Sequence, residues 1–544
     1  MRIRLSWVGL SAVIAASGFV ACSSSDESNP SPTADGGPET STPDTAVPEE
    51  AGAKDCTVAV IGGGAGGTHT AFRLAPTLKD GVCLIEKEKE LGGRIKDVTL
   101  EDNPTADAPR VGVGARRVME TQEVLFSLAK ELGIELDAPS NGTDLIEARG
   151  AYAFSKDDLA AAKYPTVPAS PDPKVDKETF LYDQLRGGPE RAKASTYKDF
   201  VTYIKAVVGE EGYNFLHDMS RFRADFEYPL DARGYLDYLD EEWDVCCQPS
   251  YPKGGMSSFI RGMEAKAKEN GARIYKDEAV QSIGKADGKY TIKTSKQTLR
   301  AEKLVIAVPP SGLESVSGEI VDKLKAQKQY QSLIGVKVVT ITQWWGDAWW
   351  KVVKDPNAAE NAQTWRAWST KNCFNFIEIP IDKWAEPQKV TRSVYVDKKS
   401  CADFWEDLFN KSGEAGVAAE IQKQLGEMFS NGVSSPATVN VPTAMKTRVQ
   451  IWPAAWYWLK EGANMTNADL ATWATEPLAG EQVGLVGEAY NVQRSGWSDA
   501  AYKSSIRLLN TKYGQSLPGL GNKIRPFASF DPSRDPKRRC VNGR

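Results

Sequence analysis

The chain has 544 residues, more than one ordinary hydrophobic core needs, so two or three intertwined units are expected. Its 67 Lys and Arg residues against 72 Asp and Glu residues give a net charge of −5, a balance that argues against nucleic acid as a partner. Only two histidines occur, His69 and His217, and no pair of cysteines has the CxxC spacing of a zinc site. The composition therefore argues against Ser-His-Asp catalysis and against a metal centre.

The N-terminal region reads as an export signal followed by a tether. Residues 1–21 begin with a short basic segment and continue as a mostly apolar run, which is typical of a secretory signal and too short at its apolar centre for a membrane span. The small residue directly before Cys22 resembles a bacterial lipobox, so Cys22 is predicted to carry lipid; the alternative is an ordinary secretory signal with an incidental cysteine. Residues 22–53 are rich in Ser, Pro, Thr, Asp and Glu, which predicts a flexible tether. We therefore expect an exported protein anchored to the bacterial cell envelope, with Ser23 favouring the outer membrane.

Seven cysteines remain once Cys22 is assigned to lipid, and an odd number leaves at least one thiol unpaired. Cys83 lies within an apolar run, where a free cysteine behaves as a small apolar residue. Cys246 and Cys247 are adjacent, which leaves a vicinal disulfide and two separate fates as alternatives.

Residues 57–94 carry the strongest motif of the chain. An apolar run at 58–61 breaks into a glycine-rich turn and continues as a helix-like pattern, and the glycines fit GxGxxG. Gly62 allows the turn, Gly64 lets a pyrophosphate approach the backbone, and Gly67 lets the helix pack on the strand. Ala65 and Gly66 complete an electropositive helix N-terminus that suits a diphosphate.

A second apolar run at 82–85 ends in Glu86, which is placed to bind a ribose hydroxyl, and Lys87 beside it is a further candidate cofactor contact. Gly92-Gly93-Arg94 follows shortly afterwards. Together these features resemble the flavin amine oxidase family, in which the glycine doublet and its arginine contact the diphosphate of FAD. The resemblance implies FAD, with Gly93 and Arg94 among its contacts; for the GxGxxG taken alone, a plain glycine-rich turn is the alternative.

Residues 111–118 resemble the GAMR segment of L-amino acid oxidases, whose final arginine pairs with the substrate carboxylate. Arg117 matches that arginine, Arg116 replaces the methionine, and Gly114, Ala115 and Arg116 become candidate cofactor contacts. The planar fork of a guanidinium donates two parallel hydrogen bonds to a carboxylate, which suits Arg117 to this task. The alternative is that Arg116 and Arg117 bind an FAD phosphate or an internal acid.

The chain leaves and re-enters the cofactor domain several times. Residues 119–249 have mainly helical periodicity, including a stripe at 124–132 that stops at Gly133, and predict a helical part of the substrate domain. Residues 257–269 predict a helix, and residues 272–283 predict a strand carrying Val280, whose counterpart in the family lends its backbone to the adenine. We therefore expect a discontinuous Rossmann-like FAD-binding domain made of residues 54–118, 250–313 and 480–515.

Residues 314–479 complete a mixed-sheet substrate domain. The apolar run at 335–341 resembles the family strand whose lysine holds a water near flavin N5, and Lys337 occupies that position as a catalytic candidate; an exposed lysine on a solvated strand face is the alternative. Residues 450–458 supply a catalytic candidate, Trp458, with Trp452, Trp456 and Tyr457 as the other members of an apolar cage. A core or interface cluster is the alternative for these aromatic residues.

The last motif resembles the closing segment of the family. Gly487 and Glu488 match the residues that meet the ribityl side of FAD, and Gly496, Trp497 and Ser498 open a helix whose N-terminus points at the flavin. No cysteine lies in this segment, so FAD is expected to be bound non-covalently. Residues 516–544 form a C-terminal tail.

The resemblance implies an α/β protein with the two-domain amine oxidase architecture. It implies FAD-dependent oxidative deamination of L-amino acids with O2, which yields 2-oxo acids, ammonium and hydrogen peroxide. An amine or polyamine oxidase is the first alternative, and a surface lipoprotein that keeps a flavin fold without catalysis is the second. The expected partners are a small-molecule amino acid or amine and O2, without nucleic acid, with a membrane only through the lipid at Cys22; an oligomer is left open.

Overall fold

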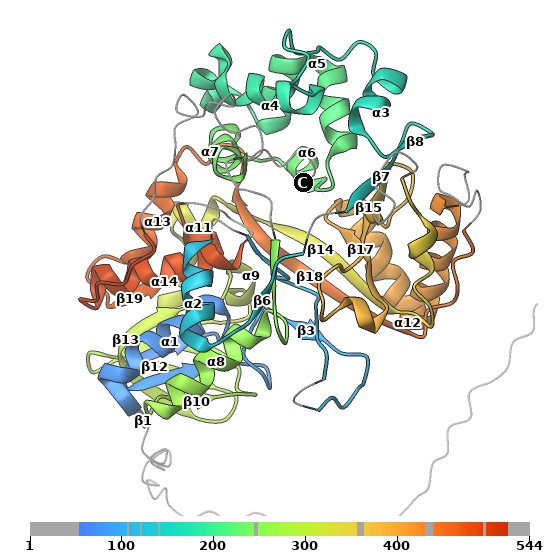
Figure 1. Cartoon of the computed structure of the whole chain (residues 1–544). Coiled ribbons are helices and arrows are strands. Elements are labelled where there is room, and N and C mark those ends of the chain that lie inside the picture. Colours follow the sequence, from blue (N-terminus) through green and yellow to red (C-terminus); the bar gives the residue numbers. More distant parts are fainter. Residues whose placement is uncertain are drawn as a thin grey trace, which may run out of the picture. The chain divides into compact units, whose positions relative to one another are not determined.

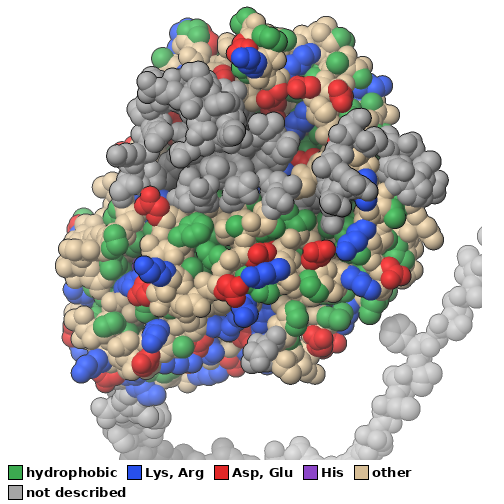
Figure 2. All heavy atoms as spheres, viewed as in Figure 1, with side chains coloured by type: hydrophobic (Ala, Val, Ile, Leu, Met, Phe, Trp, Pro, Cys, Tyr) green, Lys and Arg blue, Asp and Glu red, His purple; other side chains and the backbone are tan. Residues whose placement is uncertain are grey.

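Two large sheets organise the computed structural model, which describes residues 54–105, 108–119, 122–139, 142–243, 249–355, 364–429, 439–492 and 497–520. Both sheets belong to one compact unit (Figure 1). Charged side chains of both signs are interspersed over the visible face of the described residues (Figure 2), in keeping with the nearly balanced composition.

The first sheet holds the glycine-rich turn and is built from three separate parts of the chain. Its strand order is β10-β2-β1-β13-β12-β11, with β19 paired to β13. The strands are β1 (Lys54–Ile61), β2 (Val82–Ile85), β10 (Arg273–Tyr275), β11 (Val280–Ala286), β12 (Lys289–Thr294), β13 (Thr298–Ile306) and β19 (Val483–Leu485). The predicted discontinuous Rossmann-like sheet is thereby confirmed, since β10, β2, β1, β13 and β19 run parallel.

Helices cover both faces of this sheet, as a buried parallel sheet requires. Val58 and Val60 of β1 pack toward one set of helices, whereas Ala59 and Ile61 pack toward the other, because successive strand side chains point to opposite faces. The first set is α1 (Ala65–Leu78), α2 (Glu123–Leu132), α8 (Ser257–Glu269) and α14 (Ser498–Lys512); the second is α9 (Pro310–Leu313), α10 (Glu319–Lys325), α11 (Lys328–Gln331) and α13 (Asn467–Thr475).

The second sheet is mixed and has the order β18-β14-β17-β16-β15-β7-β8. Its strands are β7 (Thr143–Ala148), β8 (Ala151–Ala153), β14 (Leu333–Trp344), β15 (Thr364–Ser369), β16 (Phe376–Glu378), β17 (Val390–Val396) and β18 (Lys446–Leu459). One face packs on α12 (Lys399–Phe429), which is kinked at Gly413. The long antiparallel pair of β14 and β18 connects the region of this sheet to the cofactor region.

A group of helices forms the remaining large part, coloured green and teal in Figure 1. It contains α3 (Lys156–Lys163), α4 (Lys177–Gly187), α5 (Phe200–Met219), α6 (Ala224–Glu227) and α7 (Ala232–Trp243). The expectation of a mainly helical segment at 119–249 is therefore only partly right, because β7 and β8 of this segment pair into the second sheet.

Short elements complete the described chain. The small strands are β3 (Asp97–Val98), β4 (Val111–Gly112), β5 (Val118–Met119), β6 (Leu136–Asp137) and β9 (Pro249–Pro252), and the 3-10 turns are η1 (Lys79–Gly81), η2 (Pro189–Thr196), η3 (Trp349–Val352), η4 (Glu386–Gln388) and η5 (Glu488–Tyr490). Gly133 ends α2 in the left-handed region at φ 68°, as the pattern predicts, and α8 has the predicted bounds. The single strand expected at 272–283 is instead split into β10 and the start of β11. None of the helices in the described ranges is both long and apolar enough to cross a membrane.

Two disulfides correct the prediction that Cys83 is free. Cys83 is bonded to Cys56, with a Cα–Cα distance of 5.9 Å, and Cys373 is bonded to Cys401. The reason is that β1 and β2 are neighbouring parallel strands and that Cys56 and Cys83 pack into the same core cluster on one side of the sheet. Cys22, Cys246, Cys247 and Cys540 lie outside the described residues.

Candidate active site

A cavity of about 1250 Å³ extends from the glycine-rich turn to the helices α3 and α4. Its walls come from both sheets and from the N-termini of α1 and α14. This volume exceeds that of an ordinary small-ligand pocket, which is about 300–1,000 Å³. The cavity is large enough for a dinucleotide together with a substrate.

The glycine-rich turn forms one end of the cavity. Gly62 adopts φ +100° and donates its N–H to Ile85 O at 2.8 Å, so the chain can turn sharply after β1. A Cβ on Gly67 would lie 1.9 Å from Gly62 O, whereas a Cβ on Gly64 would meet nothing closer than 3.9 Å. Gly67 therefore permits helix packing away from the cavity, while Gly62, Gly64, Ala65 and Gly66 line it.

Glu86 follows β2 and is buried. Its carboxylate accepts hydrogen bonds from Gly63 N at 2.7 Å and from Glu88 N at 2.9 Å, and burial raises its pKa. Carboxylate oxygens carry two lone pairs each, so Glu86 retains acceptor capacity for ribose hydroxyls. Lys87 and Val280 line the same end of the cavity.

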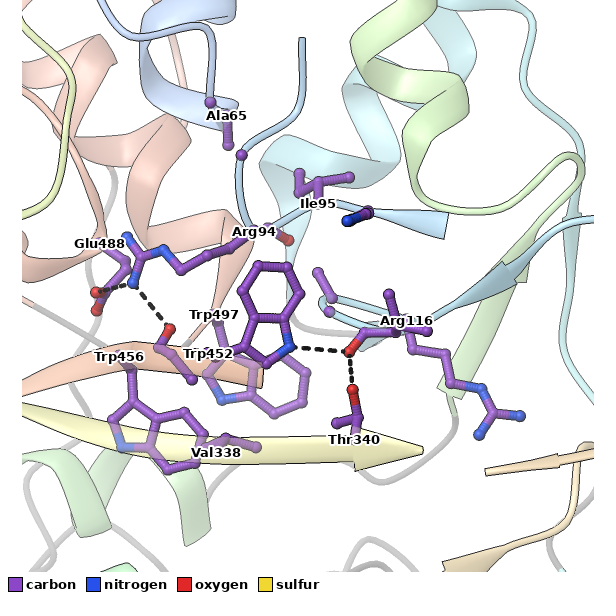
Figure 3. A pocket seen from close by; sticks show the side chains of 18 of the residues that line it. Ala65, Arg94, Ile95, Arg116, Val338, Thr340, Trp452, Trp456, Glu488 and Trp497 are labelled. Atoms are coloured by element: carbon purple, nitrogen blue, oxygen red, sulfur yellow. Dashed lines mark hydrogen bonds and ion pairs between the residues drawn. The ribbon is translucent and has the colours of Figure 1, made fainter. Parts of the chain in front are cut away.

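The second glycine motif lies across the turn from the first. Gly93 adopts φ +56°, and a Cβ there would lie 3.3 Å from Gly64 Cα, which explains the need for glycine. Arg94 donates from Nη1 to Glu488 at 2.7 Å and to Ala455 O at 2.8 Å (Figure 3). Arg94 and Glu488 thus form a fixed pair in the cavity wall, and both remain candidate contacts of FAD.

The predicted GAMR-like segment closes against Arg94. A Cβ on Gly114 would lie 1.9 Å from Arg94 O, and Ala115 N donates to the same carbonyl at 3.2 Å. The carbonyl of Val113 accepts from Thr340 Oγ1 at 2.7 Å and from Trp452 Nε1 at 3.2 Å (Figure 3). These bonds join the cofactor segment to β14 and β18.

The last motif places a helix N-terminus at the cavity. Trp497 caps α14 with extended backbone, and Trp497 and Ser498 line the cavity. Gly487 also lines it and adopts φ +156°. An N-terminus carries partial positive charge, which suits an electron-rich flavin edge. Gly496 lies outside the described residues.

Three tryptophans of β18 line the cavity, namely Trp452, Trp456 and Trp458. Trp458 is buried and packs on Tyr235 and Tyr238 of α7, with ring centroids 5.3 and 4.4 Å away. Tyr457 points to the opposite side, where its hydroxyl accepts from Ser311 N at 2.9 Å. The predicted cage therefore loses Tyr457, while an apolar wall of three indoles remains.

The predicted position of Lys337 in the cavity is wrong. Its Nζ donates to Asp403 at 2.6 Å and to Glu406, both on α12, and Val338 and Thr340 line the cavity instead. Burial acts to lower the pKa of Lys337, but the two hydrogen bonds raise it above its ordinary value. The alternation of β14 turns Lys337 toward the α12 face.

Arg116 and Arg117 both line the cavity and share one buried acid, Glu378 of β16. Arg116 Nη1 lies 2.6 Å from Glu378 Oε2 as an ion pair without hydrogen-bond geometry, and Arg117 Nη1 donates to Oε1 at 3.3 Å. Arg392 Nη2 lies 3.6 Å from the same carboxylate. Burial acts to raise the pKa of Glu378, yet these three guanidinium groups hold it far below its usual range. The alternative of an internal acid is thus what the structure shows for both arginines, and the guanidinium of Arg116 points away from the tryptophans in Figure 3.

Several charged residues of this wall belong to no motif of the sequence. Arg221, Asp225, Glu378 and Arg392 all line the cavity and are buried. Two of them could have been recognised from the sequence, because Glu378 and Arg392 lie within apolar strands and a charge buried in such a strand needs a partner.

The residues present fit a dinucleotide cofactor. The open side of Gly64 and the N-terminus of α1 suit a diphosphate. The N-terminus of α14 suits a flavin edge, and the Glu86 carboxylate suits a ribose. Within the described ranges, no cluster of His, Cys, Asp and Glu could hold a metal ion.

Comparison with known families identifies the cofactor class. Residues 75–457, more than half of the chain, match the model of flavin-containing amine oxidoreductases. The chain belongs to this family. It is therefore a flavin-containing amine oxidoreductase, and the predicted family and a flavin cofactor are confirmed.

This chain matches solved structures with the amine oxidase fold over nearly the whole length of those structures. Putrescine oxidase bound to putrescine has a TM-score of 0.59 and 15% identity, over 85% of this chain and 99% of that one. Cyclohexylamine oxidase from Brevibacterium oxydans IH-35A has a TM-score of 0.60 and 15% identity, over 84% of this chain and 98% of that one. At this identity the likeness shows the fold alone, and it confirms the predicted two-domain amine oxidase architecture. The comparison with curated proteins gives no match.

Proposed function

We propose that this amine oxidoreductase acts on L-amino acids, converting them with O2 into 2-oxo acids, ammonium and hydrogen peroxide. The observation that carries the proposal is a group of three guanidinium groups in the cavity wall, those of Arg116, Arg117 and Arg392, which share one buried acid, Glu378. A substrate that is only an amine would bring a further positive charge beside them, whereas the carboxylate of an amino acid compensates them.

Arg117 is the residue best placed to hold this carboxylate. Its side chain is 16% exposed, and Nη1 is its single hydrogen-bonding nitrogen toward described residues. The guanidinium carbon lies 6.0 Å from the ring of Trp497, at the N-terminus of α14. Arg117 therefore has hydrogen-bond donors left for a ligand, and it lies at the end of the cavity that we assign to the flavin.

Bound FAD supplies the two-electron oxidant, and O2 regenerates it. Arg117 would orient the amino acid, and the tryptophans of β18 would exclude water from the reacting carbon. None of the described residues that line the cavity is a histidine, so the proposal uses water or no base for the amine proton.

Substitution of Arg117 tests the proposal. For Arg117→Ala we expect kcat/KM for L-amino acids to fall on the order of a hundredfold, because a charge-assisted pair is lost, while turnover of the corresponding decarboxylated amines is unaffected. Arg149→Ala is the matched control, since Arg149 stacks on Tyr164 outside the cavity. If Arg117→Ala and the wild type have equal kcat/KM for L-amino acids, the proposal is contradicted. Amine oxidation, the activity for which the putrescine and cyclohexylamine oxidases are named, would then be the better assignment.

We also propose that the enzyme works outside the cytoplasm, held by lipid at Cys22. The signal-like start of the chain supports this, as do two disulfides, which form in oxidising compartments.

A further inference from the structure

Arg221 is a buried guanidinium in the cavity wall that the reaction proposed above leaves unused. It follows the end of α5 and is only 2% exposed. Its Nε and Nη2 atoms are buried and have no hydrogen-bond partner. An uncompensated buried charge is strongly destabilising, so a site of this kind favours an anionic ligand.

The surrounding acids are already engaged by other arginines. Glu378 is shared by Arg116, Arg117 and Arg392, and Asp144 accepts two hydrogen bonds of 2.8 Å from Arg366. No carboxylate of the described residues lies within ion-pair distance of Arg221. Burial and the neighbouring Arg366 accordingly lower the pKa of Arg221 well below its ordinary value.

Aromatic rings offset only part of this charge. The Arg221 guanidinium carbon lies 5.8 Å from the rings of Phe222 and Phe376 and 5.9 Å from that of Trp368. These distances are near the outer limit of a cation–π interaction, about 6 Å. The rings surround the guanidinium with apolar surface and leave its donors unsatisfied, which is the setting in which a carboxylate binds most strongly.

Arg221 and Arg117 are near enough that, besides burial, the charge of Arg117 lowers the pKa of Arg221, but they contact different residues. Arg117 lies by Trp497 at the start of α14, whereas Arg221 lies by Phe376 of β16 and Trp368 of β15. A substrate whose first carboxylate reaches Arg117 can therefore meet a second cationic group further along the cavity.

We propose that Arg221 forms a second anion subsite, so that the preferred substrates are L-amino acids whose side chain ends in a carboxylate. This assignment rests on the proposed amino acid oxidation. It makes Arg221 a specificity-determining residue, distinct from the α-carboxylate contact at Arg117.

The test compares acidic amino acids with their neutral amides, which have nearly the same shape. With the FAD-loaded wild type, kcat/KM for L-aspartate or L-glutamate is expected to exceed that for L-asparagine or L-glutamine by about tenfold to a hundredfold. Arg221→Met should remove this preference with little change for the amides. Arg221→Lys should restore part of it, because it returns the charge without the planar fork. Arg149→Met is the matched control.

Ligand binding gives a readout that is independent of turnover. Glutarate should raise the melting temperature of the wild type more than butyrate does, and Arg221→Met should abolish the difference. The flavin spectrum and melting temperature of each variant verify its folding.

Equal turnover of acids and amides by the wild type would overturn the subsite while leaving amino acid oxidation in place. An equal loss for acids and amides in Arg221→Met would also overturn it and assign Arg221 to the α-carboxylate. Peroxide from decarboxylated amines but from no L-amino acid would overturn the proposed function and the subsite together.

Discussion

At the residue scale, the position of Lys337 decides whether this lysine assists flavin reoxidation or only stabilises the fold. Its side chain pairs with Asp403 and Glu406 of α12 and does not line the cavity. Lys337→Met should therefore change kcat and the rate of oxygen consumption by less than about twofold, and lower stability by ~1 kcal/mol at most, as for other partly exposed ion pairs. If Lys337→Met instead slows flavin reoxidation a hundredfold in oxygen-mixing experiments, Lys337 acts in the active site.

Asp397 provides a pH-dependent prediction at the same scale. It is fully buried, its Oδ1 accepts from Arg223 N at 2.9 Å, and burial and the neighbouring Asp225 raise its pKa to about 8. In the unfolded chain this carboxyl ionises near its ordinary pKa, whereas in the folded protein it stays protonated up to about pH 8. The free energy of unfolding therefore decreases as the pH rises from about 4 to about 8. Asp397→Asn keeps the acceptor and removes the ionisation.

The stability advantage of Asp397→Asn over wild type should accordingly grow between pH 5 and pH 8, reach at least ~1 kcal/mol, and stay constant at higher pH. Urea unfolding at a series of pH values measures it. An advantage that shrinks as the pH rises would show that Asp397 is ionised in the folded protein.

At the element scale, the packing of α1 on β1 fixes the glycine-rich turn. Gly67→Ala would place a Cβ 1.9 Å from Gly62 O, so α1 would have to move, at a cost of at least ~1–3 kcal/mol and with loss of the diphosphate contacts. We expect the purified variant to retain little flavin by absorbance. Gly426→Ala is the matched control, because a Cβ there meets nothing within 4 Å. Full flavin content in Gly67→Ala would contradict this role.

The sequence predicts the features of these elements that depend on local pattern. The strand, turn and helix around Gly62, the left-handed end of α2 at Gly133 and the bounds of α8 follow from residue types at fixed spacing. Which face of β14 carries Lys337 could not be predicted, since the pairing of β14 with β18 contains an irregularity between Val336 and Val338. A shift of one residue exchanges the two faces of a strand.

Pairings between distant segments were equally out of reach. The Cys56–Cys83 disulfide depends on β1 and β2 being neighbours, and the Glu378–Arg392 pair depends on the register of β16 and β17. The environment of Arg221 is set by β15, β16 and the end of α5, which no short motif joins. The cofactor end of the site was therefore predictable from motifs, and the substrate end was not.

At the scale of the whole molecule, the export proposal predicts where the enzyme is found. Cys22→Ser should move the activity from the membrane fraction to the soluble exported fraction and abolish labelling by a radioactive fatty acid, because a lipoprotein is anchored through this cysteine. Ser24→Ala, two residues further on, is the control. Unchanged membrane association of Cys22→Ser would exclude the lipid anchor.

The proposed function requires that arginines of the cavity wall select substrates with a carboxylate in this flavin-containing amine oxidoreductase. Anaerobic mixing of the FAD-loaded protein with L-amino acids, and with the amines formed from them by loss of the carboxylate, tests it most directly. At least one L-amino acid is expected to bleach the flavin absorbance on the order of a hundred times faster than its amine does. Faster bleaching by the amines would contradict it.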